Sequence, residues 1–194
     1  MGDVPLLELR GIEKLFPGVK ALSDMSFAVR PGSVHVLCGE NGAGKSTLCK
    51  IINGIYQPDE GEVLINGQKV VIQNPIQARH MKISMVSQEL NYIPEMTVEQ
   101  SLFLGDEPRN RIGGVDWPKI RKMTVELLER EGLPYRPDTK LKDLSISDIQ
   151  MLEIMKAVSY ESNIIIFDEP TSAITTKEVD VLFDKISQLR AKGA

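Results

Sequence analysis

The sequence contains little cysteine. Among its 194 residues are two cysteines, which are too few for a disulfide framework. The chain must therefore be held together by a hydrophobic core, and its length and its hydrophobic content of 42% are sufficient to build one. We expect Cys38 and Cys49 to be small buried side chains in a protein whose thiols stay reduced.

Long apolar runs and clusters of basic residues are also absent. No stretch approaches the ~18 consecutive apolar residues that a membrane-spanning helix needs, so none is predicted. The formal net charge is −4 and no run of lysine or arginine occurs, which argues against a nucleic-acid-binding surface. Length and composition are typical of one globular domain, or of one compact unit with a small subdomain.

The first fifty residues predict strands followed by a helix. Mixed apolar and polar segments at 6–16 and 21–30 are expected to form antiparallel strands. The apolar run VHVLCG at 34–39 is typical of a buried parallel strand, in which His35 would be packed. A helix is predicted to follow from about 44 to 53.

The rest of the chain alternates between strand and helix patterns. Asn66-Gly67 is placed like a two-residue hairpin turn, and buried strands are predicted at 82–88 and 162–170. Between those two strands the pattern is helical from about 90 to 160, and apolar residues at helical spacing recur after 176. Strands that alternate with helices indicate an α/β fold, with a parallel sheet and helices on its faces.

The segment GENGAGKST at 39–47 matches the phosphate-binding pattern G-x-x-x-x-G-K-[ST]. It follows a predicted strand and opens a predicted helix, which is the context that this motif requires. Its glycines let the backbone wrap around a polyphosphate with N–H groups pointing inward, and the helix N-terminus adds positive potential. Lys45 would supply charge to the β- and γ-phosphates, and Ser46 a hydroxyl to Mg²⁺. The candidate nucleotide-binding residues are Gly39, Glu40, Asn41, Gly42, Ala43, Gly44, Lys45, Ser46 and Thr47.

Acidic and amide side chains end the two later strands. Asp168 stands at the carboxyl end of the strand IIIF, where ligands of an open α/β sheet bind, and it could hold Mg²⁺ directly or through water. Glu169 is placed to polarise an attacking water and is the candidate catalytic base. Gln88 ends another strand at the same edge, and a neutral amide there could contact both Mg²⁺ and water. Acidic and amide side chains at strand ends are often simply solvated. In combination with the phosphate loop, however, these residues predict an ATP site.

In this order, and with a helical insert between Gln88 and Asp168, these motifs resemble the ATP-binding subunits of ABC transporters. The resemblance covers essentially the whole chain. It implies a P-loop NTPase core with a mainly parallel sheet, an N-terminal antiparallel β subdomain and an α-helical insert. Residues 1–194 would form a single domain, with the core and β subdomain at about 1–89 and 161–194 and the helical subdomain at about 90–160. In this family Phe16 would stack on adenine.

The segment LFPGVKAL at 15–22, the phosphate loop and a signature loop without glycine look like the sugar-import branch, in which two ATPase halves are commonly fused. The chain would be the first half. The resemblance implies ATP and Mg²⁺, a second ATPase half or subunit, transmembrane permease subunits and, indirectly, an extracytoplasmic solute-binding protein. The chain would lie on the cytoplasmic face of the membrane. Permease contact is expected near 88–104, where the candidate groove residues are Tyr92, Ile93, Met96 and Phe103.

The family's signature loop falls on LSISD at 144–148, and its D-loop on 172–175. Ser145 and Asp148 also form the pattern S-x-x-D, which predicts a capping box at a helix start. Both interpretations are compatible, because a helix start is a natural anion site. Ser145 and Ser147 would face the ATP of an opposing subunit. The missing glycines suggest that this loop serves a partner site that hydrolyses poorly, whereas the chain's own site is competent.

The family also uses a histidine on the strand after the last predicted helix. The two histidines here are His35, on the strand before the phosphate loop, and His80, near a helix end, and neither matches that position. The sequence is therefore interpreted as a fragment that ends before that strand. We expect it to bind MgATP, to hydrolyse ATP poorly, to be less stable than the complete domain and to associate.

Two other functions would also use an ATP site. A soluble ABC-type ATPase that acts on ribosomes or DNA would need a basic face or a charged arm, against which the net charge argues. A regulatory ATP binder without hydrolysis would not need Glu169, which is present.

Overall fold

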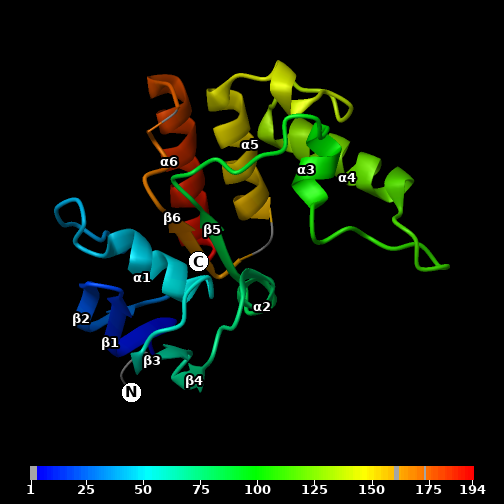
Figure 1. Cartoon of the computed structure of the whole chain (residues 1–194). Coiled ribbons are helices and arrows are strands. Elements are labelled where there is room, and N and C mark those ends of the chain that lie inside the picture. Colours follow the sequence, from blue (N-terminus) through cyan, green and yellow to red (C-terminus); the bar gives the residue numbers. More distant parts are fainter. Residues whose placement is uncertain (1–3, 160–161, 173) are drawn as a thin grey trace.

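We describe a computed structural model of the chain, which covers residues 4–159, 162–172 and 174–194 (Figure 1). An antiparallel sheet lies at one end of the molecule and a group of helices at the other, with α1, β5 and β6 between them. The elements are β1 (Leu7–Phe16), β2 (Val19–Val29), α1 (Lys45–Ile52), β3 (Glu60–Ile65), β4 (Gln68–Val70), α2 (Pro75–His80), β5 (Ile83–Val86), α3 (Val98–Phe103), α4 (Trp117–Glu131), a 3₁₀ turn (Leu141–Asp143), α5 (Ile146–Ser159), β6 (Ile164–Phe167) and α6 (Thr176–Ala191).

The N-terminal strands form an antiparallel sheet in the order β2-β1-β3-β4, as predicted for 6–16 and 21–30. β3 and β4 pair across Asn66-Gly67, whose φ angles of 51° and 75° suit a two-residue hairpin turn. Leu7 and Leu9 point into the core, and after a shift in the pairing register Ile12 does so too; Leu9 and Ile12 are almost fully buried in one cluster with residues of α1. This sheet therefore forms a base on which α1, the helix after the phosphate loop, is packed.

β5 and β6 form the parallel pair that the strand pattern predicted. Their register joins Ile83 to Ile164 and Val86 to Phe167, so that both strands end at the same edge. The Asp168 backbone N–H continues the ladder by donating to the Val86 carbonyl at 3.0 Å. The residues that follow the two strands are thereby brought together, although they are far apart in the sequence.

The predicted strand at 34–39 is wrong. This segment forms no ladder with the described residues, and Val34 and Val36 are 56% and 70% exposed. Cys38 and His35 are exposed rather than buried, and the His35 ring stacks on Phe27 at 5.0 Å.

A cavity of about 400 Å³ lies beside this segment. Residues 33–37, β6 and part of α6 line it. Because paired strands lie only about 4.8 Å apart, a segment on the far side of such a cavity cannot pair with β6. Within the described part of the chain β6 pairs with β5 alone. The apolar pattern predicts a strand, but pairing depends on a neighbour at hydrogen-bonding distance.

The helices α3, α4 and α5 occupy the segment between β5 and β6 that was predicted to be helical. α3 begins with a reciprocal capping box between Thr97 and Gln100, and Gly132 caps the C-terminus of α4 with a φ of 66°. α5 links two clusters, because Leu152 packs among the helices whereas Ile154 packs with residues of β5 and α6. This helix therefore connects the helical group to the parallel strands. The boundaries of the subdomains stay a prediction.

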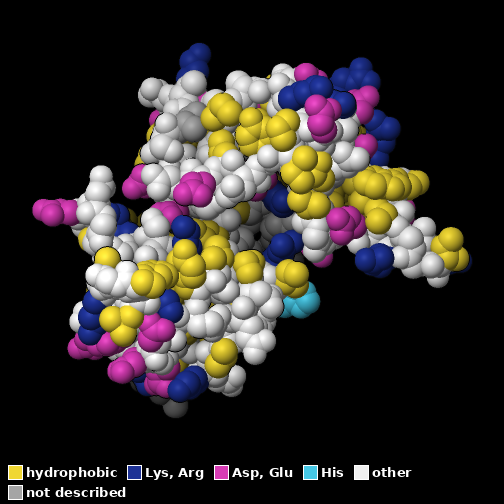
Figure 2. All heavy atoms as spheres, viewed as in Figure 1, with side chains coloured by type: hydrophobic (Ala, Val, Ile, Leu, Met, Phe, Trp, Pro, Cys, Tyr) yellow, Lys and Arg dark blue, Asp and Glu magenta, His cyan; other side chains and the backbone are white. Residues whose placement is uncertain are grey.

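The surface of the molecule is mixed in character. Figure 2 shows acidic and basic side chains interspersed on one face, with hydrophobic side chains in patches over the helical group and over the N-terminal part. Within the described ranges, no helix combines the length and the apolar character needed to cross a membrane.

Candidate nucleotide site

The phosphate loop leads directly into α1. Gly44 is the N-cap of this helix, with a left-handed φ of 87°. A Cβ atom at this position would lie 2.5 Å from the Ala21 carbonyl oxygen, so glycine is required by both conformation and space. The turn is closed by a hydrogen bond from the Ala43 N–H to the Glu40 carbonyl at 3.1 Å. The loop from 39 to 43 is exposed, with the helix N-terminus behind it.

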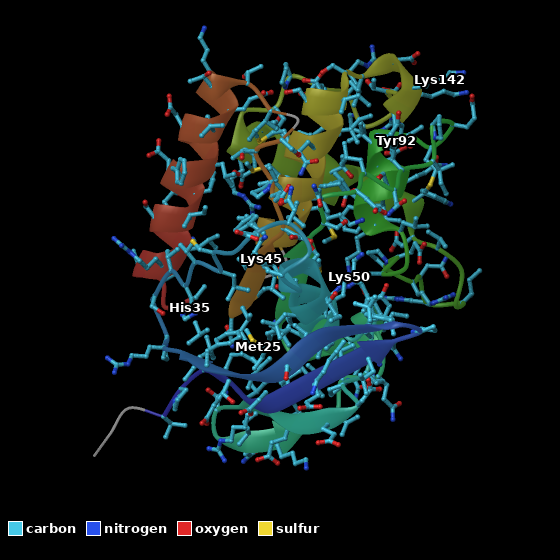
Figure 3. The ribbon with its side chains drawn as sticks, turned by 60° about the vertical axis from the view of Figure 1, so that its left-hand side comes forward. Met25, His35, Lys45, Lys50, Tyr92 and Lys142 are labelled. Atoms are coloured by element: carbon cyan, nitrogen blue, oxygen red, sulfur yellow. The ribbon has the colours of Figure 1, made fainter. Side chains whose placement is uncertain are left out.

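Lys45 folds back over this loop. Its ammonium group donates to the carbonyl oxygens of Gly39 and Glu40, at 2.8 and 2.9 Å. Figure 3 shows Lys45 at the start of α1 and Lys50 further along the same helix. The positive charge thus lies within the curve of the loop, where a polyphosphate is predicted to bind.

Ser46 connects the loop to the end of β6. Its hydroxyl donates to the Asp168 carboxylate at 3.0 Å, across 122 positions of sequence. Asp168 is buried, and its charge also reaches Cys49, one turn further along α1. Burial first, and then this neighbouring carboxylate, raise the pKa of the Cys49 thiol to about 11. The prediction that Cys49 is buried is confirmed.

Gln88 and Glu169 form a second contact at the same edge. The Gln88 amide nitrogen donates to the Glu169 carboxylate at 2.7 Å, and both side chains are exposed. Glu169 has a φ of 50°, which is unfavourable for a residue with a side chain and costs of order 1–3 kcal/mol. Such strained residues cluster at functional sites. The hydrogen bond between Gln88 and Glu169 shows that the structure brings together these two strand-end residues, both of which were selected from the sequence.

The donor atoms suit a hard cation. Ser46 and Asp168 are oxygen donors 3.0 Å apart, and Mg²⁺ prefers one or two protein oxygens together with phosphates and waters. Gln88 gives its nitrogen to Glu169, so its amide oxygen is the atom that could reach a cation. Among the described residues no group of three or more His, Cys, Asp or Glu side chains could hold a metal ion. This donor set is consistent with a Mg²⁺ site in which phosphate oxygens of the nucleotide supply the remaining ligands.

Phe16, the candidate adenine-stacking residue, ends β1 and is partly buried. Its ring packs edge-on against Tyr56, with 5.3 Å between the centroids, and the Lys14 ammonium lies 5.6 Å from its centre. Sequence reasoning missed Tyr56 and Lys14. The pattern offers no signal for Tyr56, which lies 40 residues away and meets Phe16 only in the fold.

The capping box predicted at the signature loop is confirmed. The Asp148 N–H donates to the Ser145 hydroxyl oxygen at 3.1 Å, and the Ser145 N–H and hydroxyl donate to Asp148 at 3.1 and 2.7 Å. The Tyr135 hydroxyl donates to the other oxygen of Asp148. Burial and this carboxylate raise the pKa of Tyr135.

Ser147 is directed to a second helix. Its hydroxyl donates to Glu178 of α6 at 2.5 Å, and Glu178 also forms the capping box of that helix with Thr175. Sequence reasoning missed Glu178. The pattern T-x-x-E at 175–178 could have identified it as a cap, although not its contact with Ser147. Of the proposed D-loop, residue 173 lies outside the described residues.

The candidate permease groove is divided between core and surface. Tyr92, Met96 and Phe103 are partly buried and pack against the core of the helical group. Ile93 is 52% exposed. His80 ends α2, as predicted, and is exposed.

Comparison with known proteins places this geometry in context. The family model described as ABC transporter matches residues 22–172. A protein of Burkholderia lata, whose name assigns it to ribose/galactose/methyl galactoside import as an ATP-binding protein, is 52% identical over 97% of this chain. A relative with the same assignment from Rhizobium meliloti is 49% identical over 99% of the chain. The chain spans only 36% and 38% of the length of these two relatives.

Solved structures agree with the sequence relatives. A nucleotide-free ATP-binding cassette from an ABC transporter has a TM-score of 0.80 and 28% identity, covering 97% of this chain and 78% of its own. The ADP conformation of an ATP-binding cassette has a TM-score of 0.78 with the same identity and coverage. These matches confirm the predicted P-loop fold with its antiparallel β part, parallel strands and helical insert. With its motifs assembled on one edge, the chain belongs to the ABC transporter family.

Proposed function

We propose that this chain is the ATP-binding and ATP-hydrolysing unit of an ABC importer, and that its nucleotide site is built from 39–47 with Gln88, Asp168 and Glu169. The hydrogen bond between Ser46 and Asp168 carries this proposal, because it joins the phosphate loop to a strand end 122 positions away. A loop whose only role was a turn into α1 would not require a buried carboxylate at its edge.

Each residue then has a chemical role. Backbone N–H groups of the loop and the Lys45 ammonium would bind the phosphates, and the ring of Phe16 would support adenine. Ser46, Asp168 and Gln88 would hold Mg²⁺, which when bound neutralises charge on the β- and γ-phosphate oxygens. Glu169, oriented by Gln88, would orient the attacking water and accept its proton.

The transported solute is proposed to be a sugar. The names of the relatives assign them to ribose/galactose/methyl galactoside import, and they are half identical to this chain. This favours an importer over an ATPase that acts on ribosomes or DNA. The expected partners are a second ATPase half or subunit, membrane permeases that contact the region 88–104 and, indirectly, an extracytoplasmic solute-binding protein. The chain would work at the cytoplasmic face of the membrane.

MgATP binding tests the site in the chain itself. Isothermal titration calorimetry should show binding to the wild type and a loss of at least about tenfold in Lys45→Ala, which removes the charge within the loop. Lys122→Ala is the matched control, because Lys122 is an exposed lysine on α4. Absence of binding to the wild type, or equal affinities for Lys45→Ala and wild type, would exclude this site.

Hydrolysis tests the catalytic assignment. We expect little turnover by the isolated chain, since its ATP must meet a signature loop from an opposing unit. In the assembled transporter, Glu169→Gln should lower ATP turnover at least about 100-fold, because it removes the general base. Near-normal turnover of that variant would place the competent site elsewhere in the assembly.

A further inference from the structure

The N-termini of α5 and α6 are joined by a single carboxylate oxygen. The Glu178 Oε2 atom accepts from the Ser147 hydroxyl at 2.5 Å and from the Thr175 N–H and hydroxyl, both at 2.7 Å. Figure 1 shows the two helices side by side. The first turn of α5, which carries the signature loop, is therefore tied to the segment that follows Glu169.

The hydroxyl groups of both serines of the signature loop donate hydrogen bonds to carboxylates of the same chain. Ser145 donates to Asp148 at 2.7 Å, and Ser147 donates to Glu178. A hydroxyl has one proton, so a serine that donates to a carboxylate presents only lone pairs to any other anion. Burial tends to raise the pKa values of Asp148 and Glu178, but hydrogen bonds from Tyr135, Ser145, Ser147 and Thr175 outweigh it and hold them below their usual range. Both groups are charged at neutral pH.

We propose that Glu178 is a positioning residue that retains the hydroxyl of Ser147 and thereby weakens the hold of this signature loop on a phosphate presented by the opposing ATPase unit. The proposal rests on the proposed function. An incoming phosphate would have to displace Glu178 from Ser147 in order to accept a hydrogen bond from the Ser147 hydroxyl, and would approach a like charge while doing so. Ser145 is held differently, because its bonds to Asp148 form the cap of α5 itself.

Glu178→Gln is the informative variant. Glutamine serves as well as glutamate in a capping box, so the start of α6 should persist, but its neutral oxygen accepts a hydrogen bond only about half as strongly as a carboxylate. Ser147→Ala removes the donor that the proposal requires. Glu126→Gln is the matched control, since it neutralises an exposed helical glutamate whose partner is Lys122 of the same helix.

The measurement is equilibrium binding of a nonhydrolysable ATP analogue to the assembled pair of ATPase units, together with the ATP dependence of turnover. Glu178→Gln should lower the Kd, and the KM, about three- to tenfold, with kcat changed less than about twofold. Glu126→Gln should leave both constants unchanged. In the Ser147→Ala background the gain from Glu178→Gln should disappear.

Three results would overturn the proposal. An unchanged or weaker affinity in Glu178→Gln would show that the residue only caps α6. An equal gain in the presence and absence of the Ser147 hydroxyl would show that its charge acts without positioning Ser147. If the wild-type assembly neither bound nor hydrolysed ATP, the proposed function would be wrong, and this inference with it. If the wild type were active but Glu178→Gln left the Kd and KM unchanged, only this inference would be wrong.

Discussion

Two glycines of the phosphate loop allow the steric part of its stability to be measured separately from its backbone strain. Gly42 and Gly44 have nearly the same left-handed φ, 84° and 87°. A Cβ at Gly42 would meet nothing within 4 Å, whereas one at Gly44 would lie 2.5 Å from the Ala21 carbonyl oxygen and 2.6 Å from a methyl group of Leu22. Gly42→Ala and Gly44→Ala therefore impose similar strain but very different contacts.

The expected magnitudes follow from these distances. Left-handed backbone costs an alanine about 1–2 kcal/mol at either position, and the loss of unfolded-state freedom offsets part of this in both variants. The methyl of Leu22 can move aside, but the Ala21 carbonyl is backbone of β2 and lies between Lys20 and Leu22, which both pair with β1, so it is less free to move. Overpacking of this kind costs typically about 1–3 kcal/mol. Gly44→Ala should thus be less stable than Gly42→Ala by about 1–3 kcal/mol.

Urea unfolding followed by circular dichroism measures this difference, with equal denaturant slopes as the condition for comparing the two free energies. MgATP calorimetry on the same samples would show whether the loop still accepts phosphate. Gly42→Ala is the internal control, because it carries the strain alone. A difference below about 0.5 kcal/mol would refute the close packing of Gly44 on β2.

Two further predictions concern the signature loop and the exposed segment. Tyr135→Phe should lower stability at pH 7 by about 1–2 kcal/mol, because Asp148 loses a donor. The folded pKa of Asp148 lies below its usual 3.8, so its stabilisation is present above that pH and lost as pH falls further; urea titrations should show the deficit shrinking below about pH 4, and an equal deficit at all pH values would contradict the assignment. Val36→Thr should change the unfolding free energy by less than about 0.5 kcal/mol, whereas Ile12→Ala in the core should cost about 2–5; similar losses would show that 34–39 is buried.

The sequence was sufficient to predict the phosphate loop and the edge that faces it. Glycine spacing, a lysine at the helix start and an acid after four apolar residues each reflect local requirements, so Lys45, Ser46 and Asp168 could be selected without coordinates. Strand direction then brought Gln88 and Glu169 together, since parallel strands end at a common edge. The capping box of Ser145 and Asp148 is likewise a local pattern.

Contacts between distant segments were not predictable in this way. The pairing of Ser147 with Glu178 depends on how α5 and α6 approach each other, and that of Phe16 with Tyr56 on where α1 ends. The prediction of a strand at 34–39 was wrong for the same reason. The apolar pattern is typical of a strand, but it carries no information about the cavity between this segment and β6. Local patterns determine what a segment can form, and the tertiary neighbours decide whether it does.

The two thiols differ in a way that is useful for experiments. At pH 7 a thiol with a pKa of about 11 is ionised in only about one molecule in ten thousand, and Cys49 is also enclosed, so alkylating reagents and mild oxidants should leave it intact. Cys38 stands in the open immediately before the first glycine of the phosphate loop. A fluorophore can therefore be attached to the natural chain at one site, next to the loop where arrival of a nucleotide would alter its surroundings.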